Sequence, residues 1–276
     1  MTQHVVILAI LGLLGAYQRG DRDAVAQYGA QTGVLELSQA LAAPERGERL
    51  AAIQAATSAG QDAWVLLAPL ANRARERDRP VAAAAARAAV RISEDIDRRR
   101  ALEWHIPADA LHDRLVAWRE LARDEGGWPD VRVHAMETAA RLHAALGDDA
   151  TEAPFDLPSS LADPEPEVRR AALELLPMPL PNELHATVIA RVTADGDPTV
   201  ALVAAQTVCI TIALDAKAAP ILAALGDAGL ARLRELVLEP GAPPSAVIDA
   251  ARCLAADPNP LSDTVLRSLG LERARQ

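Results

Sequence analysis

Few aromatic residues, few cysteines and no long apolar run are the first features of this sequence. Phe, Trp and Tyr make up 3% of the 276 residues, and because strands favour aromatic and β-branched side chains, an all-β fold is excluded. The two cysteines, Cys209 and Cys253, are too few for a disulfide-rich scaffold and do not form a CxxC redox motif. No stretch has the ~18–20 apolar residues of a transmembrane helix, so no membrane-spanning segment is expected.

Positive charge is also in short supply. The formal net charge is −10, which argues against nucleic acid as a partner, because that binding requires clustered Lys and Arg. Many of the arginines gather in the first hundred residues, at alternate positions from Arg73 to Arg79 and at 98–100, and an acidic excess follows in residues 101–200. This pattern has two explanations: solvated helix faces, or charge complementarity within the chain or between copies of it.

The amino-terminal segment Val5–Ala16 contains twelve residues without a polar side chain. Its length fits the apolar core of a signal peptide spanning residues 1–16, but no Lys or Arg precedes it and Leu14 occupies a position that requires a small residue. The alternative is a buried first helix, although a terminal helix of a repeat protein should have one polar face. An exported, periplasmic location and a cytoplasmic location therefore both stay open.

Alanine, the best helix former, is abundant at 60 residues. Residues 161–177 read LADPEPEVRRAALELLP, in which an Asp-Pro turn precedes apolar residues at helical spacing. The same order recurs at Arg77–Val90, Gly127–Leu142, Asp195–Val208, Pro240–Leu254 and, more weakly, Pro44–Ile53. The prolines suit the first turn of a helix, and Asp78, Asp163 and Asp197 are predicted to help cap these helices.

A second segment with helical periodicity precedes each of these turns, so the repeating unit is a helical hairpin. These segments are Leu35–Ala42, Asp62–Arg75, Ala108–Arg123, Phe155–Leu161, Leu184–Val192 and Ala228–Leu238. The equivalent positions of the following helices are Glu48, Val81, Val131, Val168, Val200 and Val247, which recur every 32 to 50 residues, near the ~40 of a two-helix repeat. The sequence predicts an all-α fold, a right-handed α-solenoid of about six helical hairpins.

The V-R-x-A-A-x-x-L pattern of Val168–Leu175 resembles the second helix of HEAT repeats, and Pro80–Val90 echoes it. The resemblance implies a HEAT-like, armadillo-like repeat array over residues 34–260. The N-terminal segment and first helices would then occupy 1–33, and a C-terminal capping helix or tail would occupy 261–276. A tetratricopeptide array is the main competing fold, but its regular 34-residue period is absent.

HEAT repeats often carry an arginine after the valine, and Arg132 and Arg169 match it. Elsewhere the position holds Ala82, Ala201 and Ile248. These departures put a continuous ladder of Asp and Arg along the array in doubt.

The sequence contains no motif for catalysis, metal binding or cofactor binding. The six histidines never recur at the i, i+4 spacing that places two imidazoles on one helix face, and P-loop, dinucleotide-binding and nucleophile-elbow motifs do not occur. We therefore expect no catalytic residue, no metal and no cofactor. Trp64 and Trp118 are expected in the core, while Trp128, in a Gly-Gly-Trp-Pro turn, suits either the core or a partner contact.

A solenoid leaves a long concave surface formed mainly by the second helix of each hairpin. Positions two and six after each reference residue, together with the next turn, share one helix face. The candidate partner-binding residues are Trp128 and, on this face, Arg87, Arg91, Glu137, Arg141, Arg170, Glu174, Gln206 and Asp249 with Cys253. The sequence thus favours a non-catalytic scaffold or adaptor that binds another protein.

Two other functions stay open. One is an enzyme or enzyme subunit similar to the HEAT-type phycobilin lyases, which hold a tetrapyrrole or its acceptor protein. The other is an envelope-attached structural protein, which would depend on Val5–Ala16.

The two cysteines test the register of the last two repeats. Cys209 lies nine residues after Val200 and Cys253 six after Val247, so they are offset by about one turn, ~5.4 Å, on helices ~8–10 Å apart. That separation exceeds the ~7 Å between Cα atoms that a disulfide can bridge. Two free thiols are therefore expected, with Cys253 the more reactive.

Overall fold

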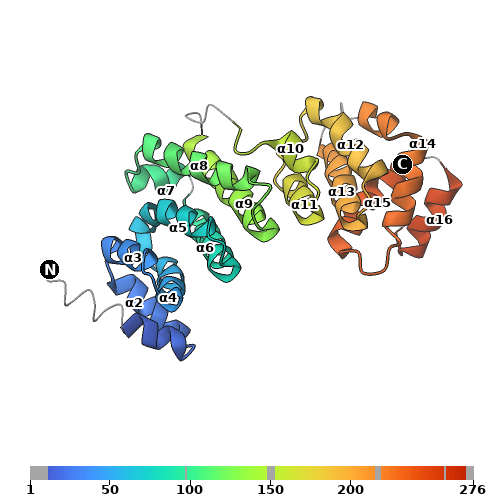
Figure 1. The fold of residues 1–276 in the computed structure, drawn as a ribbon. Helices are drawn as coiled ribbons and strands as arrows, with labels where there is room; N and C mark the ends of the chain where they lie inside the picture. Colours follow the sequence, from blue (N-terminus) through green and yellow to red (C-terminus); the bar gives the residue numbers. More distant parts are fainter. Residues whose placement is uncertain (1–11, 97, 148–152, 215–218, 258, 272–276) are drawn as a thin grey trace. The chain divides into compact units, whose positions relative to one another are not determined.

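The computed structural model describes residues 12–96, 98–147, 153–214, 219–257 and 259–271. The chain divides into two compact units, Met1–Ser160 (unit 1) and Leu161–Gln276 (unit 2). Both are built from helices, and the described residues contain no strand (Figure 1). Alanine-rich segments with apolar stripes at helical spacing account for this all-helical secondary structure. The predicted all-α, HEAT-like fold is confirmed.

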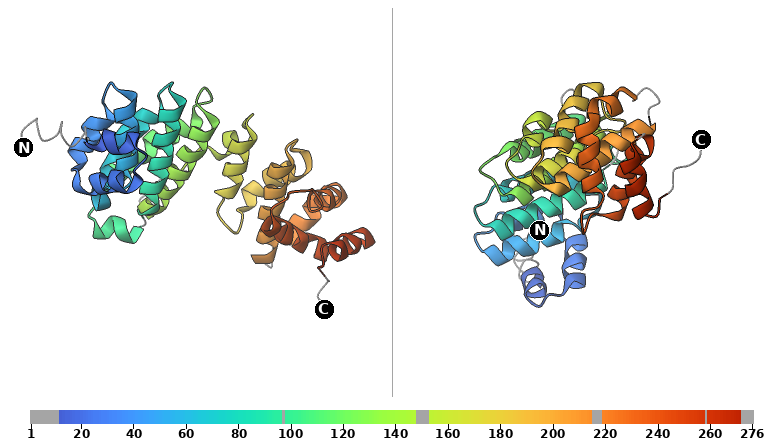
Figure 2. Two further views of the ribbon diagram at one scale, coloured as in Figure 1. Left: turned by 90° about the horizontal axis from the view of Figure 1, so that it is seen from below. Right: turned by 90° about the vertical axis from the view of Figure 1, so that its right-hand side faces the viewer.

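Unit 1 consists of two layers of helices that alternate along the chain (Figure 2). After a helix at 12–18 come α2 (Arg22–Gln31), α3 (Val34–Leu41), α4 (Arg46–Ala56), η1 (Gly60–Leu66), α5 (Leu67–Ala74), α6 (Arg79–Glu94), α7 (Arg98–Glu103), α8 (Ala108–Arg123) and α9 (Pro129–Leu146). One layer contains α3, α5 and α8, and the other contains α4, α6 and α9. We call α4, α6 and α9 the second-layer helices of unit 1.

Unit 2 repeats this arrangement. Helix α10 (Leu157–Leu161) spans the sequence boundary between the two units. The helices of unit 2 are α11 (Pro166–Glu174), η3 (Asn182–Leu184), α12 (His185–Ala194), α13 (Pro198–Leu214), α14 (Ala219–Leu236), α15 (Pro244–Ala256) and α16 (Pro260–Ser268). The second-layer helices here are α11, α13 and α15, whereas α12 packs on α14 in the first layer. Gly226, with φ 62°, interrupts α14, so its continuous part agrees with the predicted segment Ala228–Leu238.

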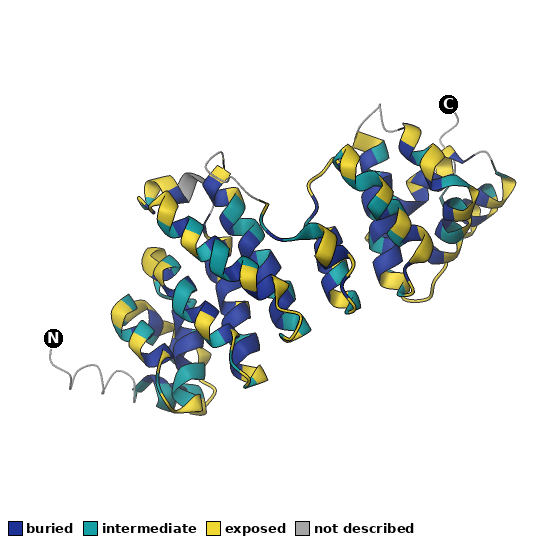
Figure 3. Ribbon diagram, turned by 45° about the horizontal axis from the view of Figure 1, so that its top comes forward, coloured by how far each residue is buried: buried dark blue, intermediate teal, exposed yellow. Residues whose placement is uncertain are grey.

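In the second-layer helices other than α4, the first turn buries at least one side chain, and burial follows one side of each helix (Figure 3). In α4 the predicted reference residue Glu48 is only half-buried. Val168 and Val200, each two residues after an N-terminal proline, are 0% and 1% exposed. In α15 the residue at this place is Ala246, which is buried, whereas Val247 is half-buried. The predicted equivalence of Val247 and Val200 is therefore wrong by one residue.

The turns before α11, α13 and α16 each contain a buried aspartate, of which the capping prediction included only Asp163. Asp163, Asp195 and Asp257 each accept a hydrogen bond from the backbone N–H two residues later, at 2.9, 3.0 and 3.1 Å. Each lies in the pattern A-D-x-x-P, so the proline begins the next helix.

Of the three predicted caps, Asp197 is confirmed, because its Oδ1 accepts from the N–H groups of Thr199 and Val200. Asp163 accepts a hydrogen bond from the N–H of Glu165, the N-cap residue of α11. Asp78 makes no side-chain cap bond and instead pairs with Arg46 at 2.9 Å, so the capping prediction is wrong there.

Cys209 and Cys253 form a disulfide between α13 and α15, with their Cα atoms 5.4 Å apart. The prediction of two free thiols is wrong, as is the greater reactivity of Cys253, since both residues are 1% exposed. Two causes account for the error. With Ala246 as the reference residue the offset shrinks from three residues to two, and the facing alanines, Ala205 and Ala250 among them, let the helices approach closely.

The basic and acidic segments pair with each other inside unit 1. Arg75, after α5, binds Glu120 of α8 at 3.0 Å, and Arg79 of α6 binds Asp130 of α9 at 3.6 Å. Charge complementarity within the chain, one of the two explanations of the charge pattern, is therefore confirmed for these arginines.

The predicted signal peptide lies mainly outside the described residues, which begin at 12. Its last part is helical, and Leu13 and Ala16 are buried in unit 1, with Leu14 beside Gly47 of α4. Among the helices described, none is long and apolar enough to span a bilayer.

Candidate protein-binding face

In unit 1 the candidate residues gather on α6 and α9. Arg87 and Arg91 are exposed on α6, and Glu137 and Arg141 are half-buried on α9. Arg141 pairs with Glu94 of α6, with 3.4 Å between Nη2 and Oε1. Arg141 thus links α9 to the last residue of α6.

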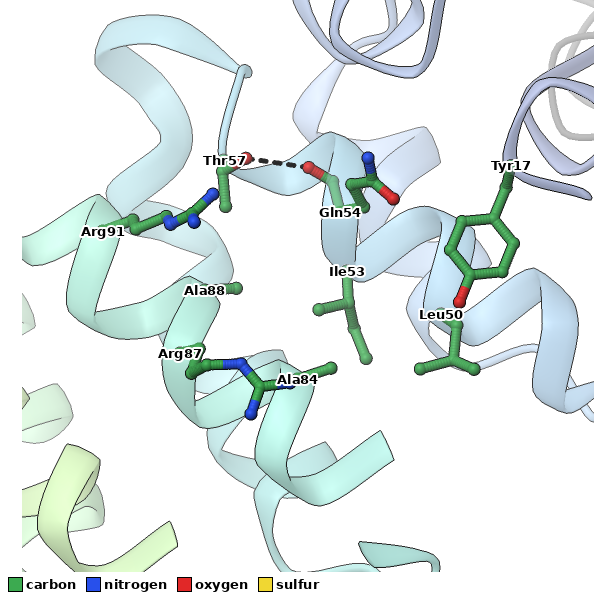
Figure 4. A pocket seen from close by; sticks show the side chains of 9 residues that line it. All are labelled: Tyr17, Leu50, Ile53, Gln54, Thr57, Ala84, Arg87, Ala88 and Arg91. Atoms are coloured by element: carbon green, nitrogen blue, oxygen red, sulfur yellow. Dashed lines mark hydrogen bonds between the residues drawn. The ribbon is translucent and has the colours of Figure 1, made fainter. Parts of the chain in front are cut away.

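A groove of about 180 Å³ lies between α4 and α6 (Figure 4). We call it the arginine groove; its lining residues are Tyr17, Leu50, Ile53, Gln54, Thr57, Ala84, Arg87, Ala88 and Arg91. The α4 wall is aliphatic at Leu50 and Ile53, whereas the α6 wall carries the two arginines one turn apart. The small side chains of Ala84 and Ala88 leave the space between the walls open.

The α4 residues of this groove are absent from the candidates, although a signal for one of them exists. Gln54 lies six residues after Glu48, which is the spacing that selects Arg87 and Glu137. The weaker repeat pattern of Pro44–Ile53 is the reason that α4 contributed no candidate.

Arg87 and Arg91 differ from most other arginines of unit 1. Ion pairs with Asp or Glu are formed by Arg46, Arg49, Arg73, Arg75, Arg79, Arg123 and Arg141. Within the described part of the chain, neither Arg87 nor Arg91 has a hydrogen-bond or ion-pair partner. A ligand carboxylate can therefore bind these guanidinium groups without displacing a protein carboxylate.

The candidates in unit 2 are bonded to one another. Gln206 of α13 donates to Asp249 of α15 at 2.9 Å, and Asp249 also pairs with Arg252 at 2.9 Å. Arg170 and Glu174 pair along α11 at 3.7 Å. Cys253 is not on this face, because it is buried in the disulfide; Arg252, missed through the one-residue register error, takes its place.

Arg169 stabilises a turn. Its Nη1 donates to the carbonyl oxygens of Asp163 and Pro164 at 2.8 and 3.0 Å, and its Nε and Nη2 bind the two carboxylate oxygens of Asp195 at 2.8 and 2.7 Å. Burial alone would raise the pKa of Asp195, but hydrogen bonds from Arg169 and the Asp197 N–H, with the charges of Arg169 and Arg191, hold it below its usual value. The hydrogen bond to Asp195 raises the pKa of Arg169.

Arg49 makes the same contacts in the first hairpin, with the carbonyl oxygens of Ala43 and Pro44 at 3.0 and 2.7 Å. It also pairs with Glu76 at 3.4 Å. The carboxylate–arginine ladder is thus present at α4 and α11, although the sequence comparison did not select Arg49.

The tryptophans occupy three kinds of environment. Trp118 is fully buried, as predicted, and Trp64 is only half-buried, with the Arg114 guanidinium 4.7 Å from its ring centre. Burial lowers the pKa of Arg114 despite the nearby charge of Asp113. Trp128, the N-cap residue of α9, is 39% exposed, and the Arg79 guanidinium carbon lies 5.4 Å from its ring centre. Part of the indole is therefore accessible at the N-terminal end of α9.

The described residues contain no group of three or more His, Cys, Asp or Glu arranged to hold a metal ion. No protein-family model and no curated protein matches the sequence. Among solved structures, the chain is similar to one determined for microtubule plus-end tracking by XMAP215, CLIP-170 and EB1, a TOG domain of the HEAT-like solenoid type. The TM-score is 0.50 at 15% identity, over 74% of this chain and 92% of that chain. At this identity the similarity shows the fold alone.

Proposed function

We propose that this protein is a non-catalytic scaffold that binds another protein through its second-layer helices. The arginine groove carries the proposal, because two guanidinium groups without partners among the described residues lie beside an aliphatic wall (Figure 4). Protein interfaces combine aliphatic contact with arginine side chains, and Arg is enriched at their energetic centres.

The repeat fold supports the same function. Stacked hairpins present a row of side chains from successive helices, which suits an extended partner. The structural neighbour comes from proteins that track microtubule plus ends, which makes protein binding one use of such a fold. The partner of the present chain is inferred from the residues that line its own groove, not from the structural neighbour.

The proposal gives no residue a catalytic role. A protein similar to the phycobilin lyases would instead gain visible absorbance when mixed with a bilin. We expect no such change.

Site-specific photo-crosslinking in the native host tests the scaffold function. The photoreactive residue p-benzoylphenylalanine replaces Glu137 on α9 or Glu174 on α11, and the controls carry it at Asp113 on α8 or Ala190 on α12 in the first layers. We expect partner adducts from the second-layer positions only. Adducts from the controls alone, or from no position, would contradict the proposal.

A further inference from the structure

The arginine groove has walls of different chemistry. Arg87 and Arg91 extend from α6 toward α4, while Leu50 and Ile53 form the opposite wall (Figure 4). A ligand in this groove therefore meets positive charge on one side and aliphatic surface on the other.

The spacing of the arginines fits an extended peptide. Residues four apart on a helix are separated by ~6 Å along its axis, and side chains two apart on an extended chain are ~6.6–6.8 Å apart on the same side. Two carboxylates at positions i and i+2 can therefore face Arg87 and Arg91 together. The side chain between them then points to the opposite wall, at Leu50 and Ile53.

Resting on the scaffold function proposed above, we infer that the arginine groove binds an extended acidic–aliphatic–acidic segment of a partner protein. The carboxylates accept hydrogen bonds from Arg87 and Arg91, and the aliphatic side chain packs mainly on the half-buried Leu50, next to the buried Ile53. Gln54, on the α4 side, supplies amide hydrogen bonds for the peptide backbone. The aliphatic wall and the net charge of −10 favour such a peptide over a nucleic acid, whose binding needs a broad basic surface.

A phage-displayed library of random 12-residue peptides, selected on the immobilised full chain, tests this inference. We expect enrichment of sequences with Asp or Glu at i and i+2 around Leu, Ile or Val. Fluorescence anisotropy of an enriched peptide then measures its affinity. Arg91→Glu should weaken binding by about tenfold or more, because it removes a charge-assisted hydrogen bond and adds repulsion.

Arg77→Glu is the matched control, because Arg77 is exposed, lies outside the groove and has no partner among the described residues. It changes the net charge equally and should leave the affinity within about twofold, as expected for a surface charge outside the site. Replacing both peptide acids with Lys should restore binding to the Arg87→Glu/Arg91→Glu variant.

Three results would overturn the inference. They are the failure to enrich acidic–aliphatic–acidic peptides, equal affinity of an enriched peptide for the parent and for Arg91→Glu, and equal affinity of the parent for acidic peptides that lack the alternating aliphatic residue. Enriched peptides of other chemistry, together with photo-crosslinks from Glu137 or Glu174, would overturn this inference and leave the scaffold function standing. The absence of both enriched peptides and second-layer crosslinks would overturn both.

Discussion

The two units use the same hairpin but treat the polar side chains of their second-layer helices differently. In unit 2, Asp249 accepts a hydrogen bond from Gln206 and pairs with Arg252. In unit 1, Arg87 and Arg91 have no partner among the described residues. A polar group that is bonded inside the protein must give up that bond to bind a ligand, so the face of unit 1 is better suited to binding.

The bonds that join neighbouring helices are also more buried in unit 2 than in unit 1. Unit 1 relies on partly exposed ion pairs such as Arg75–Glu120, and such pairs contribute ~0–1 kcal/mol each. Unit 2 joins α13 to α15 through Cys209–Cys253 and buries the carboxylates of Asp195 and Asp257. The predictions below test whether unit 2 owes its stability to these internal connections.

The largest expected effect is that of the disulfide. It closes 44 residues of sequence, and loop-closure entropy assigns such a bond about 4 kcal/mol. Replacing both cysteines with Ala should therefore destabilise unit 2 by several kcal/mol and leave unit 1 unchanged. Hydrogen exchange measured by mass spectrometry resolves the two units, with faster exchange expected in α13 and α15.

A reductant provides the control for the disulfide. It should reproduce the effect in the parent and do nothing to the double-Ala variant. Unchanged exchange in α13 and α15 after complete reduction would show that noncovalent packing suffices.

Val168→Asp should cost on the order of 3 kcal/mol or more, because it places an unpaired charge at a fully buried position between the layers. Leu175 is half-buried at the end of α11, so Leu175→Asp should cost less, about 1 kcal/mol. Urea unfolding followed by circular dichroism measures both. Equal losses for the two variants would contradict the assignment of the buried side of α11.

The Arg169–Asp195 pair makes unit 2 sensitive to acid. A carboxyl whose folded pKa lies below its unfolded value of ~3.9 stabilises the fold above that unfolded value, and the contribution is lost as pH falls through the folded pKa. Asp195→Asn should therefore destabilise unit 2 by ~1–2 kcal/mol at pH 7 and flatten the loss of stability below about pH 4.

Asp227→Asn is the control for that variant, because Asp227 is exposed and has no ion-pair partner among the described residues. It removes one acidic charge as Asp195→Asn does and should change the free energy of unfolding of unit 2 at pH 7 by less than ~0.5 kcal/mol. An unaltered slope for Asp195→Asn would remove Asp195 from the acid response.

The hairpins could be predicted from the sequence because proline and apolar periodicity act locally. Val168 and Val200 mark buried first turns correctly. Before α15, Pro243 and Pro244 are both possible first residues of the helix, and the sequence prediction took Val247 instead of Ala246 as the buried residue. Alanine is buried here but carries little hydrophobic signal. The wrong prediction of two free thiols followed from that error, because a shift of one residue turns a helical side chain by about 100° around the helix axis.

The face was predictable as a set of positions, while its chemistry was not. The spacing rule found Arg87, Glu137 and Gln206. Which of them stay unbonded depends on neighbours about 40 residues away in sequence, as with Gln206 and Asp249. A single sequence does not give these lateral pairings, because any Arg can reach several carboxylates.

The smallest effect is expected from the exposed pair Arg75–Glu120, whose side chains are 38% and 65% exposed. Arg75→Glu should cost under ~1 kcal/mol, since solvent and salt screen the pair, and the loss should shrink further in 1 M NaCl. The charge-swapped variant Arg75→Glu/Glu120→Arg should recover in urea unfolding the part of the loss that comes from the ion pair, but not the hydrogen bond from Arg75 to the Ala117 carbonyl oxygen. A loss as large as that from opening the disulfide would mean that lateral ion pairs hold unit 1 together as firmly as the covalent bond holds unit 2, and the contrast between the units would fail.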